Sequence, residues 1–102
     1  MQANPTQAVQ NYVVRANKGR SRIWLEGKRL QSAGFTAGTM FSVIKAPCGI
    51  VLQVSTTGDR KVSGKPDRPI IDLCGATVEP FTTGDSVRVV YFNNSIQIIE
   101  EV

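Results

Sequence analysis

The sequence predicts a mainly β fold with one short helix, built from two internal repeats. Three observations carry this prediction. Short runs of alternating apolar and polar residues recur along the chain, which is the period of a β-strand. Glycine and other turn residues separate these runs. The stretch RIWLEGKRLQSAGFTAGTMFSV, residues 22–43, also returns in weaker form as RPIIDLCGATVEPFTTGDSVRVV, residues 68–90.

The length of the chain favours one shared core. A chain of 102 residues makes one compact domain, and a unit of about 45 residues is too small to bury a core of its own. We therefore expect a single domain, residues 12–102, in which the repeats 12–57 and 58–102 form a fused pseudo-dimer. Residues 1–11 are polar and lack periodicity, which is typical of a flexible tail.

The first repeat is expected to contain four strands and one short helix. In residues 22–26, Ile23 and Leu25 alternate with polar residues and Trp24. The segment KRLQSA, residues 28–33, combines good helix formers with a following Gly34, a typical residue just past a helix end. The predicted strands are residues 12–15, 22–26, 40–45 and 50–55, and the first turn is Asn17-Lys18-Gly19.

The second repeat follows the same order without a full helix. Pro69 lacks an N–H and is expected at the start of a strand. Pro80 permits no more than one helical turn in residues 76–85. Asn93-Asn94 is typical of a tight hairpin turn. The predicted strands are residues 60–63, 69–74, 86–92 and 96–99.

Positive charge is concentrated in the first half. The net charge is +4, of which residues 1–51 contribute +6 (seven basic, one acidic) and residues 52–102 contribute −2 (five basic, seven acidic). This asymmetry is a hint of a polyanionic partner. A solvated basic surface that serves solubility explains it equally well.

Several classes of protein are not expected. No apolar run approaches the roughly 20 residues that cross a bilayer, and the first residues do not resemble a secretory signal. We therefore expect a cytoplasmic protein with no membrane partner. The chain has no histidine, and Cys48 and Cys74 form no CxxC-type pair, so no metal site is expected. No cofactor is expected either, because GKPDR lacks the other elements of a phosphate-binding loop.

Residues 12–55 resemble the swapped-hairpin module of the SpoVT/AbrB-like superfamily. The SymE branch is more similar still, with the order strand, Gly, short amphipathic helix, AGF-x-x-G, strand, Gly, strand. These features fall on Ile23–Gly27, Lys28–Phe35, Gly38 and Gly49. The resemblance extends to residues 60–100 only through the internal repeat. It implies a small barrel in which the strands of two units interlace.

The resemblance also implies binding to DNA or RNA, as a transcriptional regulator or a toxin–antitoxin-related factor. AbrB-like proteins bind through basic residues on the first hairpin and the segment after it, and such residues neutralise phosphates. In the second repeat ATVE replaces the Lys28-Arg29 pair, so the first half is expected to be the main binding half. The matching positions here are Arg15, Lys18, Arg20, Arg22, Lys28, Arg29, Arg60, Lys61, Lys65 and Arg68.

Two other functions stay open. The SymE branch implies an RNA-cleaving toxin, for which Glu26, the one acid in the basic half, would have to act as base. Its cationic neighbours would weaken it in that role, so a salt bridge is the expected role of Glu26 and no catalytic residue is predicted. A small protein inhibitor or adaptor is the other alternative, with a protein partner. The expected assembly is a monomeric pseudo-dimer or a weak homodimer.

Overall fold

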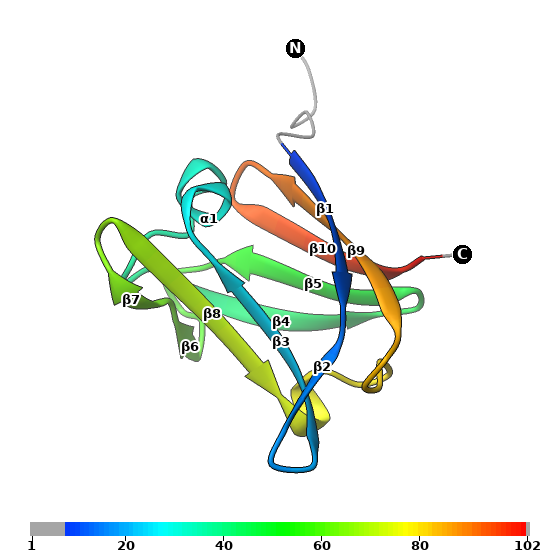
Figure 1. Cartoon of the computed structure of the whole chain (residues 1–102). Helices are drawn as coiled ribbons and strands as arrows, with labels where there is room; N and C mark the ends of the chain where they lie inside the picture. The colour runs from blue at the N-terminus through cyan, green and yellow to red at the C-terminus, as the bar shows by residue number, and fades with distance from the viewer. Residues whose placement is uncertain (1–7, 102) are drawn as a thin grey trace.

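Two antiparallel sheets make up most of the fold (Figure 1). The computed structural model describes residues 8–101. The mainly β character that the sequence predicts is confirmed. The first sheet has six strands in the spatial order β1 (Ala8–Val13), β9 (Ser86–Phe92), β10 (Ser95–Glu100), β5 (Gly49–Val54), β4 (Met40–Ala46) and β6 (Arg60–Lys61). The second has four, in the order β2 (Arg15–Asn17), β3 (Arg20–Glu26), β8 (Arg68–Cys74) and β7 (Ser63–Lys65).

The predicted short helix is present in the first half. Helix α1 (Lys28–Ser32) follows β3 and buries Leu30. Gly34 has a φ of 92°, a backbone conformation that favours glycine, and it lets the Phe35 N–H donate to the Leu30 carbonyl at 2.8 Å. In the second half a single 3-10 turn, η1 (Gly75–Thr77), takes the place of α1, as the sequence predicts.

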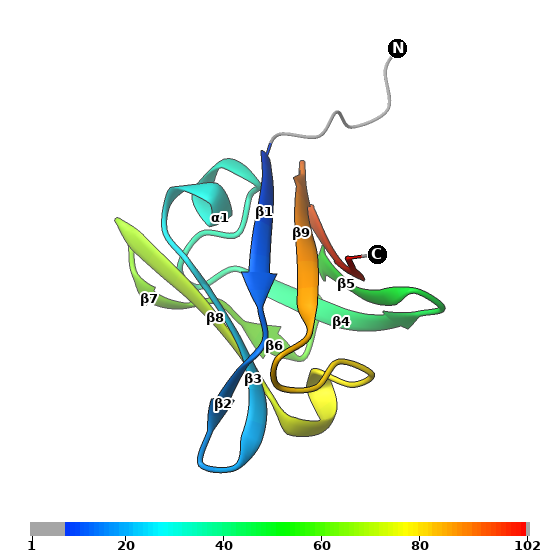
Figure 2. The ribbon, with the colours of Figure 1, turned by 45° about the vertical axis from the view of Figure 1, so that its right-hand side comes forward.

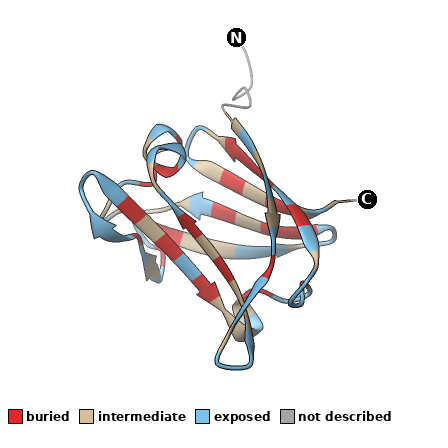
Figure 3. Cartoon of the chain, viewed as in Figure 1, coloured by how far each residue is buried: buried red, intermediate tan, exposed pale blue. Residues whose placement is uncertain are grey.

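Buried residues alternate with more exposed ones along the strands and build the core (Figure 3). Ile23 and Leu25 of β3, and Ile71 and Leu73 of β8, are at most 2% exposed, whereas their strand neighbours face outward. Both sheets and both halves of the chain contribute to one cluster of buried residues. The largest of its fully buried side chains include Leu30, Phe35, Ile50, Leu52, Tyr91, Ile96 and Ile98.

The first strand begins earlier than predicted. Residues 8–11 belong to β1 and are therefore not part of a flexible tail; the rest of that predicted tail, residues 1–7, lies outside the described residues. Strand β1 pairs with β9 along its whole length, from Ala8↔Tyr91 to Val13↔Ser86. The polar residues of β1 hide this strand from a hydrophobicity pattern, and its partner lies far away in the sequence.

Two predicted strands are each divided between the sheets. The predicted strand 12–15 is interrupted at Val14, where the chain passes from β1 to β2, and the predicted strand 60–63 is interrupted at Val62, between β6 and β7. Both valines are 1% exposed. The Val14 N–H donates to the Asp85 carbonyl at 2.9 Å, and the Val62 N–H donates to the Thr39 carbonyl at 2.9 Å. Backbone hydrogen bonds to a distant loop thus place each crossover.

The strand order of each sheet is symmetric with respect to the two halves of the chain. If β1 to β5 (without α1) are exchanged for β6 to β10, the order β1-β9-β10-β5-β4-β6 is reproduced in reverse, and so is β2-β3-β8-β7. The register agrees, since the pairing of β3 with β8 is centred on Trp24↔Asp72, and the pairing of β5 with β10 is centred on Val51↔Gln97. Strands of one half therefore pair with strands of the other throughout the molecule.

Candidate nucleic-acid interface

The outward face of the four-stranded sheet carries the densest group of predicted binding residues. Because β3 and β8 bury alternate residues, the others point away from the core. The register places Arg15 beside Arg22 and Lys65 beside Arg68, on this same face. We call this surface the Trp24 face; its residues are Arg15, Asn17, Arg20, Arg22, Trp24, Glu26, Ser63, Lys65, Arg68, Ile70, Asp72 and Cys74.

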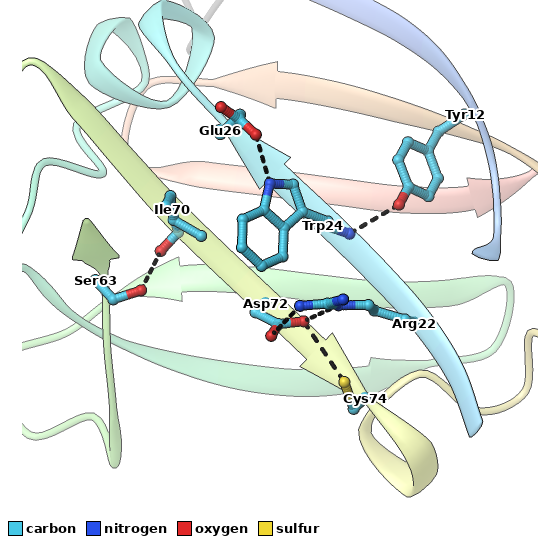
Figure 4. Close-up of polar contacts among 8 residues, drawn as sticks. All are labelled: Tyr12, Arg22, Trp24, Glu26, Ser63, Ile70, Asp72 and Cys74. Carbon is cyan, nitrogen blue, oxygen red and sulfur yellow. Dashed lines mark hydrogen bonds and ion pairs between the residues drawn. The ribbon is translucent and has the colours of Figure 1, made fainter. Parts of the chain in front are cut away.

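Arg22 is held at the centre of the Trp24 face (Figure 4). Its Nε and Nη2 atoms donate to the two carboxylate oxygens of Asp72, each at 2.9 Å. Its guanidinium carbon lies 4.5 Å from the centroid of the Trp24 ring, in the range of a cation–π contact. Two-pronged pairing and stacking use the planar shape of arginine, so Arg22 has a defined position on the face.

Both N–H groups of Trp24 donate hydrogen bonds. The indole N–H donates to a carboxylate oxygen of Glu26, and the backbone N–H donates to the Tyr12 hydroxyl at 2.9 Å. The other carboxylate oxygen of Glu26 lies 3.5 Å from Nε of Arg68. Glu26 thus accepts a hydrogen bond from Trp24 and forms an ion pair with Arg68, which agrees with the salt-bridge role that the sequence predicts for it.

The Arg22–Asp72 pair also changes the acid behaviour of the face. The hydrogen bonds from Arg22 lower the pKa of Asp72 below its ordinary value of 3.8, and partial burial of the carboxylate opposes this shift. Asp72 therefore stays ionised into moderately acidic solution. Asp72 partly neutralises the positive charge of Arg22 at every pH at which Asp72 is ionised.

Asp72→Asn is expected to lower the melting temperature at neutral pH and to lose this effect in acid. A carboxylate whose pKa is lowered by folding stabilises the protein above its unfolded pKa of 3.8, and this contribution disappears as the pH falls through the folded pKa. The difference between wild type and variant should therefore narrow below about pH 3.8. Thermal melts from about pH 7 to about pH 3 measure it. Asp59→Asn, at an exposed position without a salt bridge among residues 8–101, is the control, and a difference that is independent of pH would contradict the interpretation.

The ten predicted binding residues do not form one continuous patch. Five of them lie on the Trp24 face, but the Lys18-Gly19 turn and the Pro66-Asp67 turn lie at opposite ends of the sheet (Figure 1). The reason is that β3 and β8 are antiparallel, with Arg22 opposite Cys74, so the hairpin turns that precede these two strands point away from each other. The five on the face are Arg15, Arg20, Arg22, Lys65 and Arg68.

The remaining five predicted residues are distributed over other elements. Lys18 is at a hairpin turn with a φ of 54°, and Lys28 and Arg29 are exposed on α1. Arg60 and Lys61 form β6, at the edge of the six-stranded sheet. Arg60 is part-buried and donates to the Thr77 hydroxyl at 2.8 Å. Of these five, Arg29 approaches the Trp24 face, through the hollow described next.

A polar hollow opens beside the Trp24 face, between β1 and β3. Its volume is about 530 Å³. Three arginines and two aromatic side chains surround it, together with one amide and one carboxylate. Sequence reasoning missed Gln10 and Tyr12, which come from β1, because this strand carries no hydrophobic pattern and its partner β9 is distant in the sequence. The lining residues are Gln10, Tyr12, Arg15, Ala16, Arg22, Trp24, Glu26 and Arg29.

A hydrogen bond from β9 holds Gln10 at the edge of the hollow. The Tyr91 hydroxyl donates to Oε1 of Gln10 at 2.7 Å. Burial raises the pKa of Tyr91 to about 12, which the positive charge of Arg29 partly opposes. The hydroxyl is therefore protonated at neutral pH and remains a donor. This bond fixes the side chain of Gln10 at the wall of the hollow.

The corresponding corner of the second half is closed by internal bonds. Lys45 of β4 lies beside this corner and is the counterpart, in the repeat, of Tyr91 of β9 beside the first corner. Nζ of Lys45 donates to the carbonyls of Ala76 at 3.0 Å and Thr77 at 2.9 Å, and also to that of Glu79. Together with the Arg60–Thr77 bond these contacts leave a smaller hollow of about 260 Å³. Three arginines line the hollow between β1 and β3, whereas a single arginine, Arg60, lines this smaller one.

No significant match to this chain was found among protein-family models, curated proteins or solved structures. The resemblance to the AbrB-like module therefore remains an expectation from the sequence. Within residues 8–101, the structure contains no helix with the length and apolar character needed to cross a membrane. The same residues include no group of three or more His, Cys, Asp or Glu side chains arranged to hold a metal ion.

Proposed function

We propose that this protein binds nucleic acid through the Trp24 face. The observation that carries the proposal is the arrangement of cations on this face around one aromatic side chain. Arg15 and Arg20 lie toward one end and Lys65 toward the other, and none of the three makes a salt bridge among the described residues. Unpaired cations at both ends of a sheet are suited to neutralising phosphates along a strand, while Trp24 offers a surface for a base.

We also propose that the fold is a tandem swapped-hairpin barrel of the AbrB-like kind. The reversed strand order and the register centred on Trp24↔Asp72 support two interlaced copies of one unit. The equivalent crossovers at Val14 and Val62 support the same idea. As an AbrB-like pseudo-dimer, the protein would bind DNA or RNA as a regulatory protein.

Binding without cleavage is the favoured activity. Glu26, the candidate base, accepts the indole N–H of Trp24 and lies beside Arg68. A general base must reach the proton that it removes, and these two contacts direct the carboxylate toward its neighbours on the sheet. We therefore assign Glu26 a positioning role for Trp24.

Arg20→Ala combined with Lys65→Ala is expected to weaken nucleic-acid binding and its dependence on salt. Each phosphate contact that is lost lowers the slope of log K against log salt by nearly one, so the pair should lower it by about two. Binding of labelled oligonucleotides at several salt concentrations measures the slope. The control is Arg88→Ala, on the six-stranded sheet, where Arg88 pairs with Glu101. Unchanged affinity of the double variant at low salt would contradict a role for this face.

A further inference from the structure

The hollow exists because the two sheets separate at Val14. Strand β1 leaves toward β9, whereas β2 continues beside β3 (Figure 2). Along its upper part β3 therefore has β8 on one side and Tyr12 of β1 on the other, where the Trp24 N–H donates to the Tyr12 hydroxyl. At Trp24 this edge of β3 therefore has a side chain, Tyr12, as its neighbour in place of a strand, and the hollow lies beside it.

The walls of the hollow combine groups that suit an anion and a ring. Arg15, Arg22 and Arg29 line it, and of these only Arg22 is in a salt bridge among residues 8–101. Guanidinium groups pair with phosphate oxygens in a forked geometry. The ring of Trp24 and the ring of Tyr12 supply flat apolar surface, on which a nucleobase can stack.

The remaining polar groups of the hollow are held in place. The Tyr91 hydroxyl orients Oε1 of Gln10, which leaves the Gln10 amide nitrogen as a donor for a ligand. Glu26 is the one acid in the wall, and the Trp24 indole and Arg68 both engage it. The net charge of the lining is thus +2, from three arginines and one glutamate.

We propose that this hollow receives one unpaired nucleotide of a single-stranded nucleic acid. The proposal rests on the proposed function and names its ligand. The base lies against Trp24 and Tyr12, the adjoining phosphate pairs with Arg15 and Arg29, and Gln10 contacts the base edge. The volume of about 530 Å³ is within the range of pockets that hold small organic ligands. In a duplex the bases are paired and stacked, so placing one base in the hollow costs less free energy for a single strand than for a duplex.

One such site per chain is expected. The counterpart corner in the second half has Thr77 in place of Arg29 and Ile70 in place of Arg22, and Lys45 is bound to backbone carbonyls there. That corner lacks the arginine cluster. Two of the other three cations of the Trp24 face, Lys65 and Arg68, lie on the path of a strand that leaves the hollow along the sheet toward β7.

The sole tryptophan of the chain gives a direct test, because Trp24 lines the hollow. The full chain is titrated with single-stranded DNA, single-stranded RNA and duplex DNA of the same sequence. Trp24 emission is followed in parallel with the anisotropy of a label on the oligonucleotide. We expect one or both single strands to quench Trp24 at one site per chain and to bind about tenfold more tightly than the duplex. The comparison of the two single strands shows which backbone is preferred.

Arg29→Ala and Lys28→Ala form a matched pair for this test. Both remove one positive charge from the exposed surface of α1, and only Arg29 lines the hollow. Arg29→Ala is expected to weaken single-strand binding about tenfold, whereas Lys28→Ala should change it by less than about threefold. Thermal melts of both variants verify that they are folded.

The outcomes separate this inference from the proposed function. Three results would overturn the inference while leaving nucleic-acid binding intact. They are binding by anisotropy with unchanged Trp24 emission, equal quenching of Trp24 by the duplex, and an equal loss of affinity in the Arg29→Ala and Lys28→Ala variants. Absence of binding to all three oligonucleotides would overturn both. Quenching by a single strand that Arg29→Ala weakens selectively would support both.

Discussion

A chain that ends at residue 57 is expected to fail to fold as a monomer. Within this segment β1 loses its partner β9, β3 loses β8, and β5 loses β10. The buried side chains of β3 and β5 would then face water, and about 45 residues cannot bury an adequate core alone. We therefore expect residues 1–57 either to be unfolded or to associate as a dimer that rebuilds the missing pairings.

Sedimentation and circular dichroism of residues 1–57 measure this prediction. The matched control is an equimolar mixture of residues 1–57 and 58–102, in which the missing strands are present. This mixture is expected to regain β structure and to sediment at the mass of the full chain. A half-chain that is monomeric and melts cooperatively would contradict the interlaced arrangement.

Phe35→Ala is expected to cause a large loss of stability. Phe35 is 0% exposed and makes an edge-to-face contact with Phe41, with ring centroids 5.9 Å apart. Removing a buried phenylalanine costs about 3–5 kcal/mol, because apolar burial is lost and a cavity remains. For a domain of this size the melting temperature should fall by roughly 12 °C or more.

Val13→Ala is the control for this substitution. Val13 is 55% exposed on β1, and an exposed substitution is expected to change the free energy of unfolding by less than about 0.5 kcal/mol. Chemical denaturation of both variants gives the comparison. If Phe35→Ala destabilised the protein no more than Val13→Ala, the position of Phe35 at the centre of the core would be wrong.

The sequence predicted the elements whose signals are local. Alternation in residues 22–26 identified both the strand and its buried face, because a pleated strand turns successive side chains to opposite sides. Gly34 and the helix formers before it marked α1 and its end. The Asn17-Lys18-Gly19 and Asn93-Asn94 turns also follow from local backbone preference, and Lys18 and Asn94 do have positive φ values of 54° and 68°.

The binding face could be predicted only in part. Alternation implied that Arg22, Trp24 and Glu26 share a side of their strand. It could not reveal that Asp72 is opposite Trp24 and neutralises Arg22, because the pairing of β3 with β8 joins residues about 50 positions apart. The placement of the two hairpin turns at opposite ends follows from the antiparallel direction of that same pairing.

The sequence alone therefore determined the mainly β class, the short helix, the repeat and the faces of the central strands, since periodicity and turn chemistry act over a few residues. The tertiary structure decided where the chain crosses between sheets, and with it the hollow. Polar residues such as Gln10 become part of a strand only because β9 offers them backbone partners. That pairing brings Gln10 and Tyr12 beside Trp24 and Arg29, and it depends on packing between the two ends of the chain.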